Sequence, residues 1–188
     1  PNFIGSWMMD SIVCDEIIAY FETNKDRQKK GSRSGGIDTS FKDSTDMAIS
    51  PNDVQLPEND FFRNYFKQLH SCYDDYVKQW PFLTGFVKKI DIGYFNIQRY
   101  QPGQHFSAVH TERGDLSTLH RLYAWMTYLN DVDLGDGGST TFTHYELDVQ
   151  PKKGLTLIWP AEWTHAHKGN EMKANTKYII TGWIHFPV

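Results

Sequence analysis

The sequence predicts a mainly β fold, a double-stranded β-helix (a cupin-like jelly roll) braced by helices on one outer face. Two helix-like stretches come first, short alternating segments fill the rest of the chain, and no β–α–β alternation is present. Aromatic residues make up 15% of the chain, which is common in β cores. We expect a single domain over residues 1–188, with a helical and loop part at 1–88 and the jelly-roll core at 89–188.

The N-terminal part contains two predicted helices separated by a long polar segment. Apolar residues recur at helical spacing over residues 9–23 and 57–80, and Pro81 ends the second helix. The aromatic stripe of the second helix is typical of a packed core rather than of a cofactor site. Residues 24–50 are polar and show no clear period, so they predict a loop, with room for a short strand around residues 42–49. Such a loop is either a working lid or a disordered segment, and we favour a lid.

The remainder of the chain reads as short β-strands. Segments rich in Ile, Tyr, Phe, Trp and Thr are bounded by Gly, Pro, Asn and Asp, which favour turns. The predicted strands cover residues 95–100, 105–110, 121–129, 139–143, 155–159, 164–167 and 177–186.

Composition and charge argue against several classes of function. The formal net charge of -4 and the scattered basic residues argue against nucleic acid as a partner. No apolar run approaches the ~18 residues that a membrane span needs, and no signal-peptide pattern opens the chain. Cys14 and Cys72 lack metal-site or disulfide spacing, so we expect buried free thiols. Together these features predict a soluble, cytoplasmic protein in a reducing compartment.

Three of the eight histidines stand out by their sequence context. In His110-Thr111-Glu112, residues i and i+2 of a strand point to the same face, so the imidazole and the carboxylate are expected to project together. About 55 residues later, His165 and His167 lie in a segment predicted to be extended. Two histidines and one carboxylate on adjacent strands form a facial triad, which leaves three open positions on an octahedral ferrous ion. The other histidines are expected to be surface or hydrogen-bonded core residues: His70, His105, His120, His144 and His185.

Lys177 opens the last predicted strand, ten residues after His167. Alternation puts Lys177, Ile179, Thr181 and Trp183 on one face of that strand. A lysine that faces a barrel interior is costly unless an anion neutralises it, and a cosubstrate carboxylate would supply that anion. Taken alone, Lys177 is better explained as an ordinary lysine at a strand edge.

These residues resemble the 2-oxoglutarate/Fe(II)-dependent dioxygenase superfamily, and within it the prolyl 4-hydroxylase-like group. The resemblance spans roughly residues 90–186 and depends on the order and spacing of several motifs. The motifs are Tyr100-Gln-Pro-Gly103, the His-x-Glu tripeptide, Tyr128-Leu-Asn-Asp131, Gly137-Gly138-Ser-Thr-Thr-Phe142, Pro151-Lys-Lys-Gly154, His167-Lys-Gly169, and Lys177 through Trp183.

The resemblance implies that His110, Glu112 and His167 hold Fe(II). The family pattern prefers His-x-Asp, so the extra methylene of Glu112 has to be absorbed by a backbone shift or a tilted carboxylate. Because Glu supplies the same hard oxygen donor, we expect weaker iron affinity rather than lost binding. His165 is the alternative third ligand, and the ten-residue interval to Lys177 favours His167.

The resemblance also implies a binding site for the cosubstrate 2-oxoglutarate. Lys177 is expected to bind its distal carboxylate, with Tyr100, Tyr128 and Thr181 as hydrogen-bonding residues, and Trp183 is expected to pack beside the site. We expect residues 27–50 and 113–120 to border the entrance, and Trp125 to line the cavity.

The implied activity is hydroxylation of a C–H bond with Fe(II), O2 and 2-oxoglutarate, releasing succinate and CO2, with ascorbate as an optional reductant. Peptidyl proline is the implied substrate, while fold alone leaves other peptides, free amino acids and small molecules open. A non-catalytic jelly roll that binds a metal or a carboxylate ligand is the alternative from another class. A zinc hydrolase is less favoured, because Lys177 and the two tyrosines would lack a role. The sequence leaves the oligomeric state open.

Overall fold

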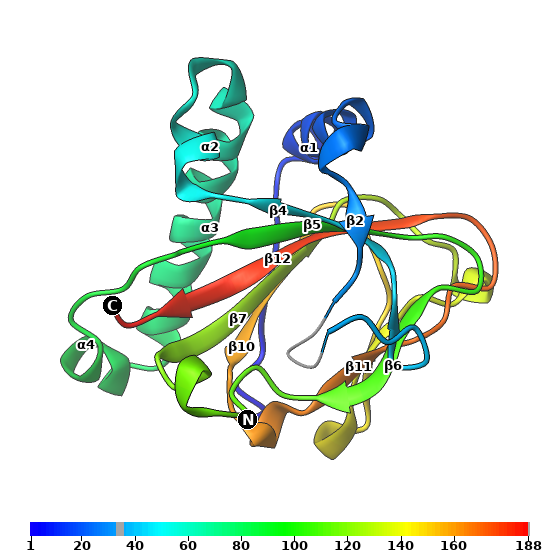
Figure 1. The fold of residues 1–188 in the computed structure, drawn as a ribbon. Helices are drawn as coiled ribbons and strands as arrows, with labels where there is room; N and C mark the ends of the chain where they lie inside the picture. Colours follow the sequence, from blue (N-terminus) through cyan, green and yellow to red (C-terminus); the bar gives the residue numbers. More distant parts are fainter. Residues whose placement is uncertain (33–35, 188) are drawn as a thin grey trace.

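Two antiparallel sheets face each other and form the body of the protein in the computed structural model, which describes residues 1–32 and 36–187 (Figure 1). The larger sheet consists, in spatial order, of β1 (Gly5–Met8), β10 (Leu155–Pro160), β7 (Arg121–Tyr128), β12 (Lys177–His185), β5 (Phe95–Tyr100), β4 (Thr45–Ile49) and β2 (Lys29–Lys30). The smaller sheet consists of β3 (Lys42–Asp43), β6 (His105–His110), β11 (His167–Gly169), β8 (Thr140–Phe142) and β9 (Leu147–Val149). The expected double-sheet jelly roll is confirmed.

The helices cover the outer face of the larger sheet (Figure 1). α1 (Ser11–Thr23) begins after Asp10, whose carboxylate accepts a hydrogen bond from the Ile12 backbone N–H. α3 (Asp60–Gln79) ends just before Trp80 and Pro81, so both sequence-predicted helices are confirmed. The shorter helices are α2 (Pro51–Gln55), α4 (Phe82–Phe86), and the 3-10 turns η1 (Lys25–Arg27), η2 (Pro57–Asn59), η3 (Leu116–Thr118), η4 (Leu134–Asp136), η5 (Thr143–Tyr145) and η6 (Trp163–His165).

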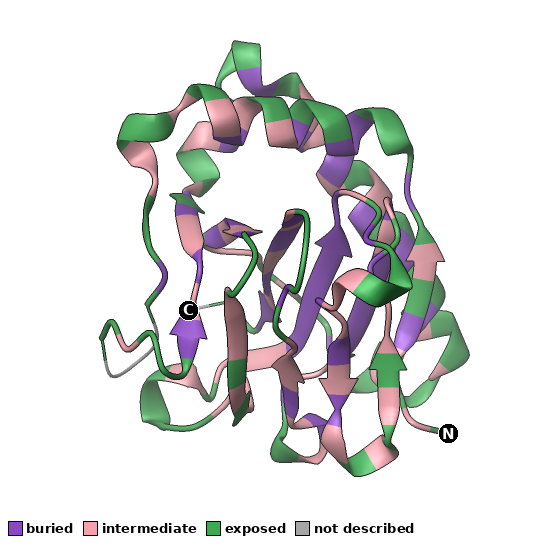
Figure 2. Cartoon of the chain, turned by 90° about the vertical axis from the view of Figure 1, so that its right-hand side faces the viewer, coloured by how far each residue is buried: buried purple, intermediate pink, exposed green. Residues whose placement is uncertain are grey.

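Side-chain alternation along the strands divides the interior into two apolar clusters. One cluster lies between the helices and the larger sheet, and the other lies between the two sheets. In β12, Ile180 and Ile184 join the helix-side cluster, whereas Ile179 joins the cluster between the sheets. Figure 2 shows these buried strands beneath helices whose outer surfaces are exposed. The aromatic stripe of α3 is therefore core, as predicted.

Trp125 does not line the space between the sheets, contrary to the expectation. It is fully buried on the opposite face of β7, where its ring packs against Tyr65 and Phe66 of α3. The alternation of β7 explains this, because its neighbours Ala124 and Met126 are the residues that face the smaller sheet.

The polar segment before α2 is only partly a loop. The anticipated strand near residues 42–49 is confirmed as β3 and β4, but these strands belong to different sheets, so this stretch crosses from one sheet to the other. β2 was not predicted, and the prediction of a loop is wrong there. Residues 33–35 of the Gly- and Ser-rich part lie outside the described residues. The role of this segment as a lid stays a prediction.

The predicted strand at residues 164–167 is wrong over most of its length. Residues Trp163–His165 form the 3-10 turn η6, closed by the bond from the His165 N–H to the Glu162 carbonyl, and only His167 begins β11.

The N-terminal part also supplies β1 to the larger sheet, although it was expected to be helix and loop. Cys14 and Cys72 are buried free thiols, as expected. Within the described ranges, no helix is long and apolar enough to span a bilayer.

Candidate metal centre

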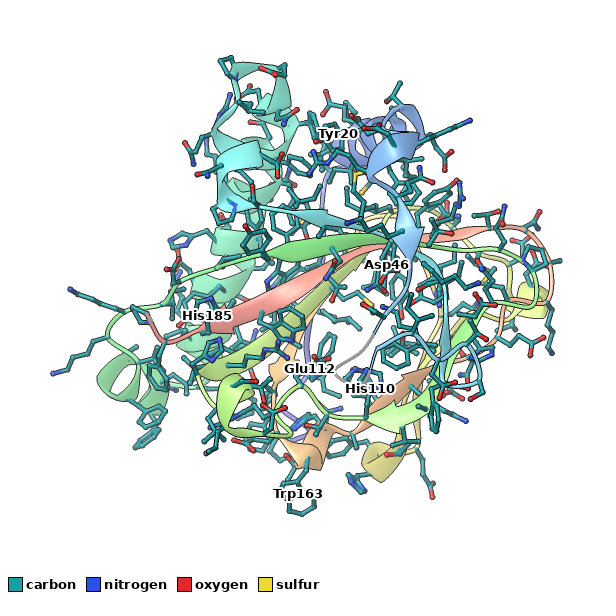
Figure 3. The ribbon with its side chains drawn as sticks, viewed as in Figure 1. Tyr20, Asp46, His110, Glu112, Trp163 and His185 are labelled. Atoms are coloured by element: carbon teal, nitrogen blue, oxygen red, sulfur yellow. The ribbon has the colours of Figure 1, made fainter. Side chains whose placement is uncertain are left out.

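Three potential ligand atoms converge at one end of the space between the sheets. His167 of β11 lies directly opposite His110 of β6 in the antiparallel pairing. The ligand atoms of His110, Glu112 and His167 all lie within 4.8 Å of one another. Figure 3 shows His110 and Glu112 side by side, with Trp163 at a distance below them. Glu112 follows the end of β6, so it is the chain beyond the strand, rather than strand alternation, that brings its carboxylate to the histidines.

Both imidazoles are oriented by backbone carbonyls. Nδ1 of His110 lies 2.8 Å from the Ala108 carbonyl oxygen, and Nδ1 of His167 lies 2.9 Å from the His165 carbonyl oxygen. Because a carbonyl only accepts, each Nδ1 carries the hydrogen and each Nε2 keeps a lone pair for the site. This is the arrangement that metal-binding histidines commonly adopt.

Aromatic rings enclose the two histidines. The ring of Phe106 stacks on His110 with centroids 3.8 Å apart and an interplanar angle of 7°. Trp159 and Phe142 pack against His167, with centroids 5.1 and 5.5 Å away. Burial, together with the neighbouring His167, lowers the pKa of His110 to about 4, which keeps this imidazole neutral and able to bind a metal.

The Glu112 carboxylate is held ionised by its neighbours. Burial alone would raise its pKa, but the hydrogen bond and positive charge that a protonated His167 provides outweigh this effect, with contributions from His110 and Trp183, and the pKa falls to about 2. A metal ion bound at Nε2 would take the place of that proton as the neighbouring positive charge. Oε1 lies 3.3 Å from Nε2 of His167, and the indole Nε1 of Trp183 donates to Oε2 at 2.6 Å. Trp183 thus lies beside the triad, as expected, and also contacts one of its members directly.

His165 does not join the triad. Its Nε2 lies 2.8 Å from the Asn2 carbonyl oxygen, and its Nδ1 lies 3.0 Å from the Thr164 hydroxyl. The turn η6 removes the strand alternation that would have put His165 on the same face as His167. The structure therefore brings His167, the ligand favoured at the sequence level, together with His110 and Glu112.

Lys177 is a buried cation between the sheets. Its side chain is fully enclosed, with the residue 3% exposed, and Nζ donates to the Gly138 carbonyl at 2.8 Å and lies 4.6 Å from the centre of the Tyr100 ring. No carboxylate among the described residues pairs with it, and burial lowers its pKa to about 7. A buried ammonium without a counter-ion is costly, and a bound anion would remove that cost.

The three residues expected to hydrogen-bond the cosubstrate are engaged with protein groups. Tyr100 donates to the Gln98 side chain at 2.7 Å, Tyr128 donates to Thr140 at 2.7 Å, and Thr181 donates to the Trp125 carbonyl at 2.8 Å. Both tyrosines belong to the apolar cluster between the sheets. A ligand carboxylate would have to draw these hydroxyl hydrogens away from their present acceptors, so the roles of Tyr100, Tyr128 and Thr181 stay predictions.

Sequence reasoning missed several polar groups near this site. Lys42 of β3 is buried and forms an ion pair with Asp46 of β4 at 2.5 Å, while its Nζ lies 5.3 Å from the Phe106 ring centre. Lys42 and Asp46 are four residues apart, a spacing that indicates an ion pair in a helix but not in an extended segment. The indole N–H of Trp159 is buried with no partner among the described residues. The sequence gives no indication that this indole N–H lacks an acceptor.

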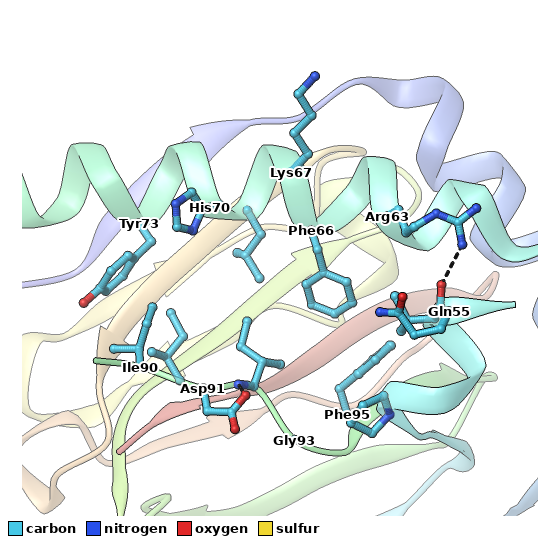
Figure 4. A pocket seen from close by; sticks show the side chains of 15 residues that line it. Gln55, Arg63, Phe66, Lys67, His70, Tyr73, Ile90, Asp91, Gly93 and Phe95 are labelled. Carbon is cyan, nitrogen blue, oxygen red and sulfur yellow. Dashed lines mark hydrogen bonds between the residues drawn. The ribbon is translucent and has the colours of Figure 1, made fainter. Parts of the chain in front are cut away.

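One cavity lies outside the space between the two sheets and carries none of the triad residues. It has a volume of about 640 Å³ and lies between α3 and the strands of the larger sheet (Figure 4). Its floor is apolar, with Phe66 and Phe95, and Arg63 at its rim donates to the Val54 carbonyl. The candidate metal ligands therefore lie between the sheets and not in this cavity.

The residues of the triad fit a divalent metal ion. Two imidazole lone pairs and the carboxylate oxygen Oε1 face one point, and such acceptors repel one another unless a cation lies among them. Two histidines and one carboxylate that leave open positions are the donor set of non-haem Fe(II) oxygenases. The class defined by this fold and site is thus a jelly-roll protein with an iron-type facial triad.

Comparison with protein families agrees with this class. The model of the 2OG-Fe(II) oxygenase superfamily matches residues 95–185. Residues 95–185 are therefore similar to this superfamily, and the chain shares its fold with solved prolyl hydroxylases. The family implies Fe(II), 2-oxoglutarate and O2, which are the cofactors expected from the sequence.

The chain is also similar to particular proteins. It is 27% identical over 179 residues to the chicken (Gallus gallus) procollagen-lysine,2-oxoglutarate 5-dioxygenase 1, covering 91% of this chain and 22% of the relative, so it spans about a fifth of that length. Its fold matches a collagen prolyl hydroxylase from Paramecium Bursaria Chlorella virus-1, with TM-score 0.72, 18% identity and coverage of 99% and 97% of the two chains. It also matches a Pseudomonas putida prolyl-4-hydroxylase, with TM-score 0.73, 16% identity and coverage of 97% and 92%.

Proposed function

We propose that the protein is an Fe(II)- and 2-oxoglutarate-dependent hydroxylase that acts on a C–H bond of peptidyl proline. The observation that carries the proposal is the coexistence, between the same two sheets, of the triad His110, Glu112 and His167 with the unpaired buried cation of Lys177. A metal site alone would fit many chemistries, and a buried cation alone would bind many anions. Together they fit a metal-chelating cosubstrate that carries a second, distal carboxylate.

The chain supplies the ligands, the anchor and the dry surroundings of the reaction. His110 and His167 would bind the metal through Nε2, and Glu112 through Oε1. Bound Fe(II) would supply the activation of O2 that converts 2-oxoglutarate, O2 and a C–H bond into succinate, CO2 and an alcohol. Lys177 would neutralise the distal carboxylate of 2-oxoglutarate and fix its orientation. Phe142 and Trp159 would exclude water beside His167.

A peptide substrate is supported by the proteins that share the fold. One of them is a prolyl hydroxylase from Trichoplax adhaerens solved with a hypoxia inducible factor oxygen degradation domain peptide fragment, with TM-score 0.73, 15% identity and coverage of 98% and 84%. The viral and bacterial proteins described above are also named as prolyl hydroxylases. Peptidyl lysine is the second candidate, because the curated relatives are procollagen-lysine dioxygenases.

The test is a mass-spectrometric screen for the gain of one oxygen. The purified protein, Fe(II), 2-oxoglutarate and air are combined with peptides that contain proline or lysine in collagen-like repeats, and with the free amino acids. We expect a proline peptide to gain one oxygen and an equal amount of succinate to form. Hydroxylation of lysine peptides alone would replace proline by lysine in the proposal.

A matched pair of histidine variants shows whether turnover depends on the triad. His167→Ala is expected to abolish succinate formation, whereas His70→Ala, at an exposed position on α3, should leave it unchanged. A wild-type protein that forms no succinate with any substrate, yet binds Fe(II) and 2-oxoglutarate, would support the non-catalytic binding protein instead.

A further inference from the structure

The carboxylate of Glu112 is held by two contacts that point in different directions. Oε1 faces Nε2 of His167 at 3.3 Å, and Oε2 accepts the indole N–H of Trp183 at 2.6 Å. The short second contact is a charge-assisted hydrogen bond, which is roughly twice as strong as a neutral one. It occupies Oε2, so Oε1 is the oxygen left to bind a metal.

Arg121 connects the backbone of Glu112 to the same tryptophan. Its NH1 donates to the Glu112 carbonyl oxygen at 2.9 Å, and its guanidinium carbon lies 3.7 Å from the centre of the Trp183 ring. β7 and β12, which carry these two residues, are paired neighbours in the larger sheet. Glu112 itself lies beyond the end of β6, where no strand pairing fixes its backbone. Arg121 and Trp183 therefore hold both ends of the Glu112 residue.

We propose that Trp183 and Arg121 form a brace that fits the metal centre to glutamate and against aspartate at position 112. An aspartate carboxylate is set back by one C–C bond, about 1.5 Å. From the backbone position that Arg121 fixes, a shortened side chain cannot reach both the metal-facing position and the indole, because a hydrogen bond stretched by that amount is lost. The inference rests on the metal-binding role proposed for the triad, and it makes Trp183 and Arg121 positioning residues.

The brace reverses an expectation drawn from the sequence. Glutamate was expected to weaken iron binding because the family pattern has aspartate at this place. With the brace, Glu112→Asp should lower metal affinity instead of raising it. The effect of Trp183 should also depend on the residue at position 112, because the indole bond exists only with glutamate.

Metal binding without turnover tests the brace. Apo protein is titrated with Co²⁺, followed by calorimetry and by the visible d–d absorption of the bound ion, with no 2-oxoglutarate present. We expect Glu112→Asp and Trp183→Phe each to weaken Co²⁺ binding about tenfold, the lower end of the range for partners that orient metal ligands. The double variant should bind no more weakly than Glu112→Asp alone. Trp163→Phe, the same change at an exposed tryptophan, should leave the affinity and the spectrum unchanged.

Arg121→Met provides a second route if Trp183→Phe does not fold. It should weaken Co²⁺ binding in the glutamate protein and have no effect in the Glu112→Asp protein. Equal or tighter binding by Glu112→Asp, or fully additive losses in the double variant, would refute the brace. If His167→Ala binds Co²⁺ as tightly as wild type, the metal role of the triad fails and the brace with it. If His167→Ala abolishes binding while Glu112→Asp binds normally, the brace alone is refuted.

Discussion

Two lysines are buried in the β-barrel, and their surroundings differ in one respect. Lys42 is 4% exposed and lies 2.5 Å from the Asp46 carboxylate, whereas Lys177 is 3% exposed and has no acidic partner among the described residues. Both ammonium groups lie over an aromatic ring, that of Phe106 for Lys42 and that of Tyr100 for Lys177. Equal burial therefore does not imply an equal role.

The difference shows which buried charge belongs to the fold and which one awaits a ligand. The Lys42–Asp46 pair joins β3 of the smaller sheet to β4 of the larger one, so its charge is satisfied within the protein. The ammonium group of Lys177 donates to a single neutral carbonyl, and a bound dicarboxylate would supply the negative charge that this site lacks. Removing each cation should then have opposite consequences for stability and for 2-oxoglutarate binding.

The largest effect is expected from Lys177→Met. Loss of a charged partner for the distal carboxylate costs about 2–5 kcal/mol, so the concentration of 2-oxoglutarate needed for half-saturation should rise roughly 100-fold. The free energy of unfolding of the apo protein should stay equal or rise, because an uncompensated buried charge is gone. Calorimetric titration of the Mn²⁺-loaded protein and urea unfolding check the two parts, and an unchanged 2-oxoglutarate affinity would refute the anchor.

Lys42→Met should lower the stability of the protein and leave its affinity for 2-oxoglutarate almost unchanged. It leaves the Asp46 carboxylate, still bonded to the Ser44 hydroxyl, buried without its cation, and we expect a loss of about 3 kcal/mol in the free energy of unfolding. The 2-oxoglutarate affinity should change less than threefold. Lys42→Met combined with Asp46→Leu should recover most of the stability in urea unfolding. A 2-oxoglutarate defect as large as that of Lys177→Met would erase the distinction between the two cations.

The pH dependence should also separate wild type from Lys177→Met. The folded-state pKa of Lys177, about 7, lies below the ordinary lysine value, so the unfolded chain binds a proton above pH 7 that the folded protein has released. The apo wild type should therefore gain stability relative to Lys177→Met as pH rises from 7 to about 10. Binding of 2-oxoglutarate needs the protonated lysine, so affinity should fall by up to about tenfold per pH unit above 7. Parallel pH profiles for the two proteins would contradict this.

The smallest effects are expected at the hydroxyl groups near Lys177. Tyr100→Phe removes the bond to Gln98 but keeps the ring beside Lys177, and we expect about a fivefold weaker 2-oxoglutarate affinity, the scale of one neutral hydrogen bond. Thr181→Val should change the affinity less than twofold, because the hydroxyl donates to the Trp125 carbonyl. If Tyr100→Phe proved as damaging as Lys177→Met in the same titration, the tyrosine hydroxyl would replace the lysine as the anchor.

The sequence predicted those parts of the site that repeat or alternate over several residues. β12 carries a regular alternation over Lys177–His185, so the inward position of Lys177 was predicted correctly. The spacing of His110 and Glu112 was also informative, although the carboxylate reaches the site from beyond the strand end. The long helix α3 and its buried stripe were predicted for the same reason.

Features decided by contacts distant in sequence could not be predicted. β2 and β3 have two residues each, too few to show a period, and their pairing partners lie elsewhere in the chain. The separation of His165 from His167 depends on a single turn closed by Glu162. The bond from Trp183 to Glu112 joins residues 71 positions apart, so only the folded chain reveals it.

A crystal soaked without oxygen in Mn²⁺ and 2-oxoglutarate tests the central claim most directly. We predict one anomalous peak bonded to Nε2 of His110, Nε2 of His167 and Oε1 of Glu112, with the distal carboxylate of 2-oxoglutarate in contact with Nζ of Lys177. A metal bound away from these three atoms, or a diacid whose far carboxylate leaves Lys177 unpaired, would contradict the account.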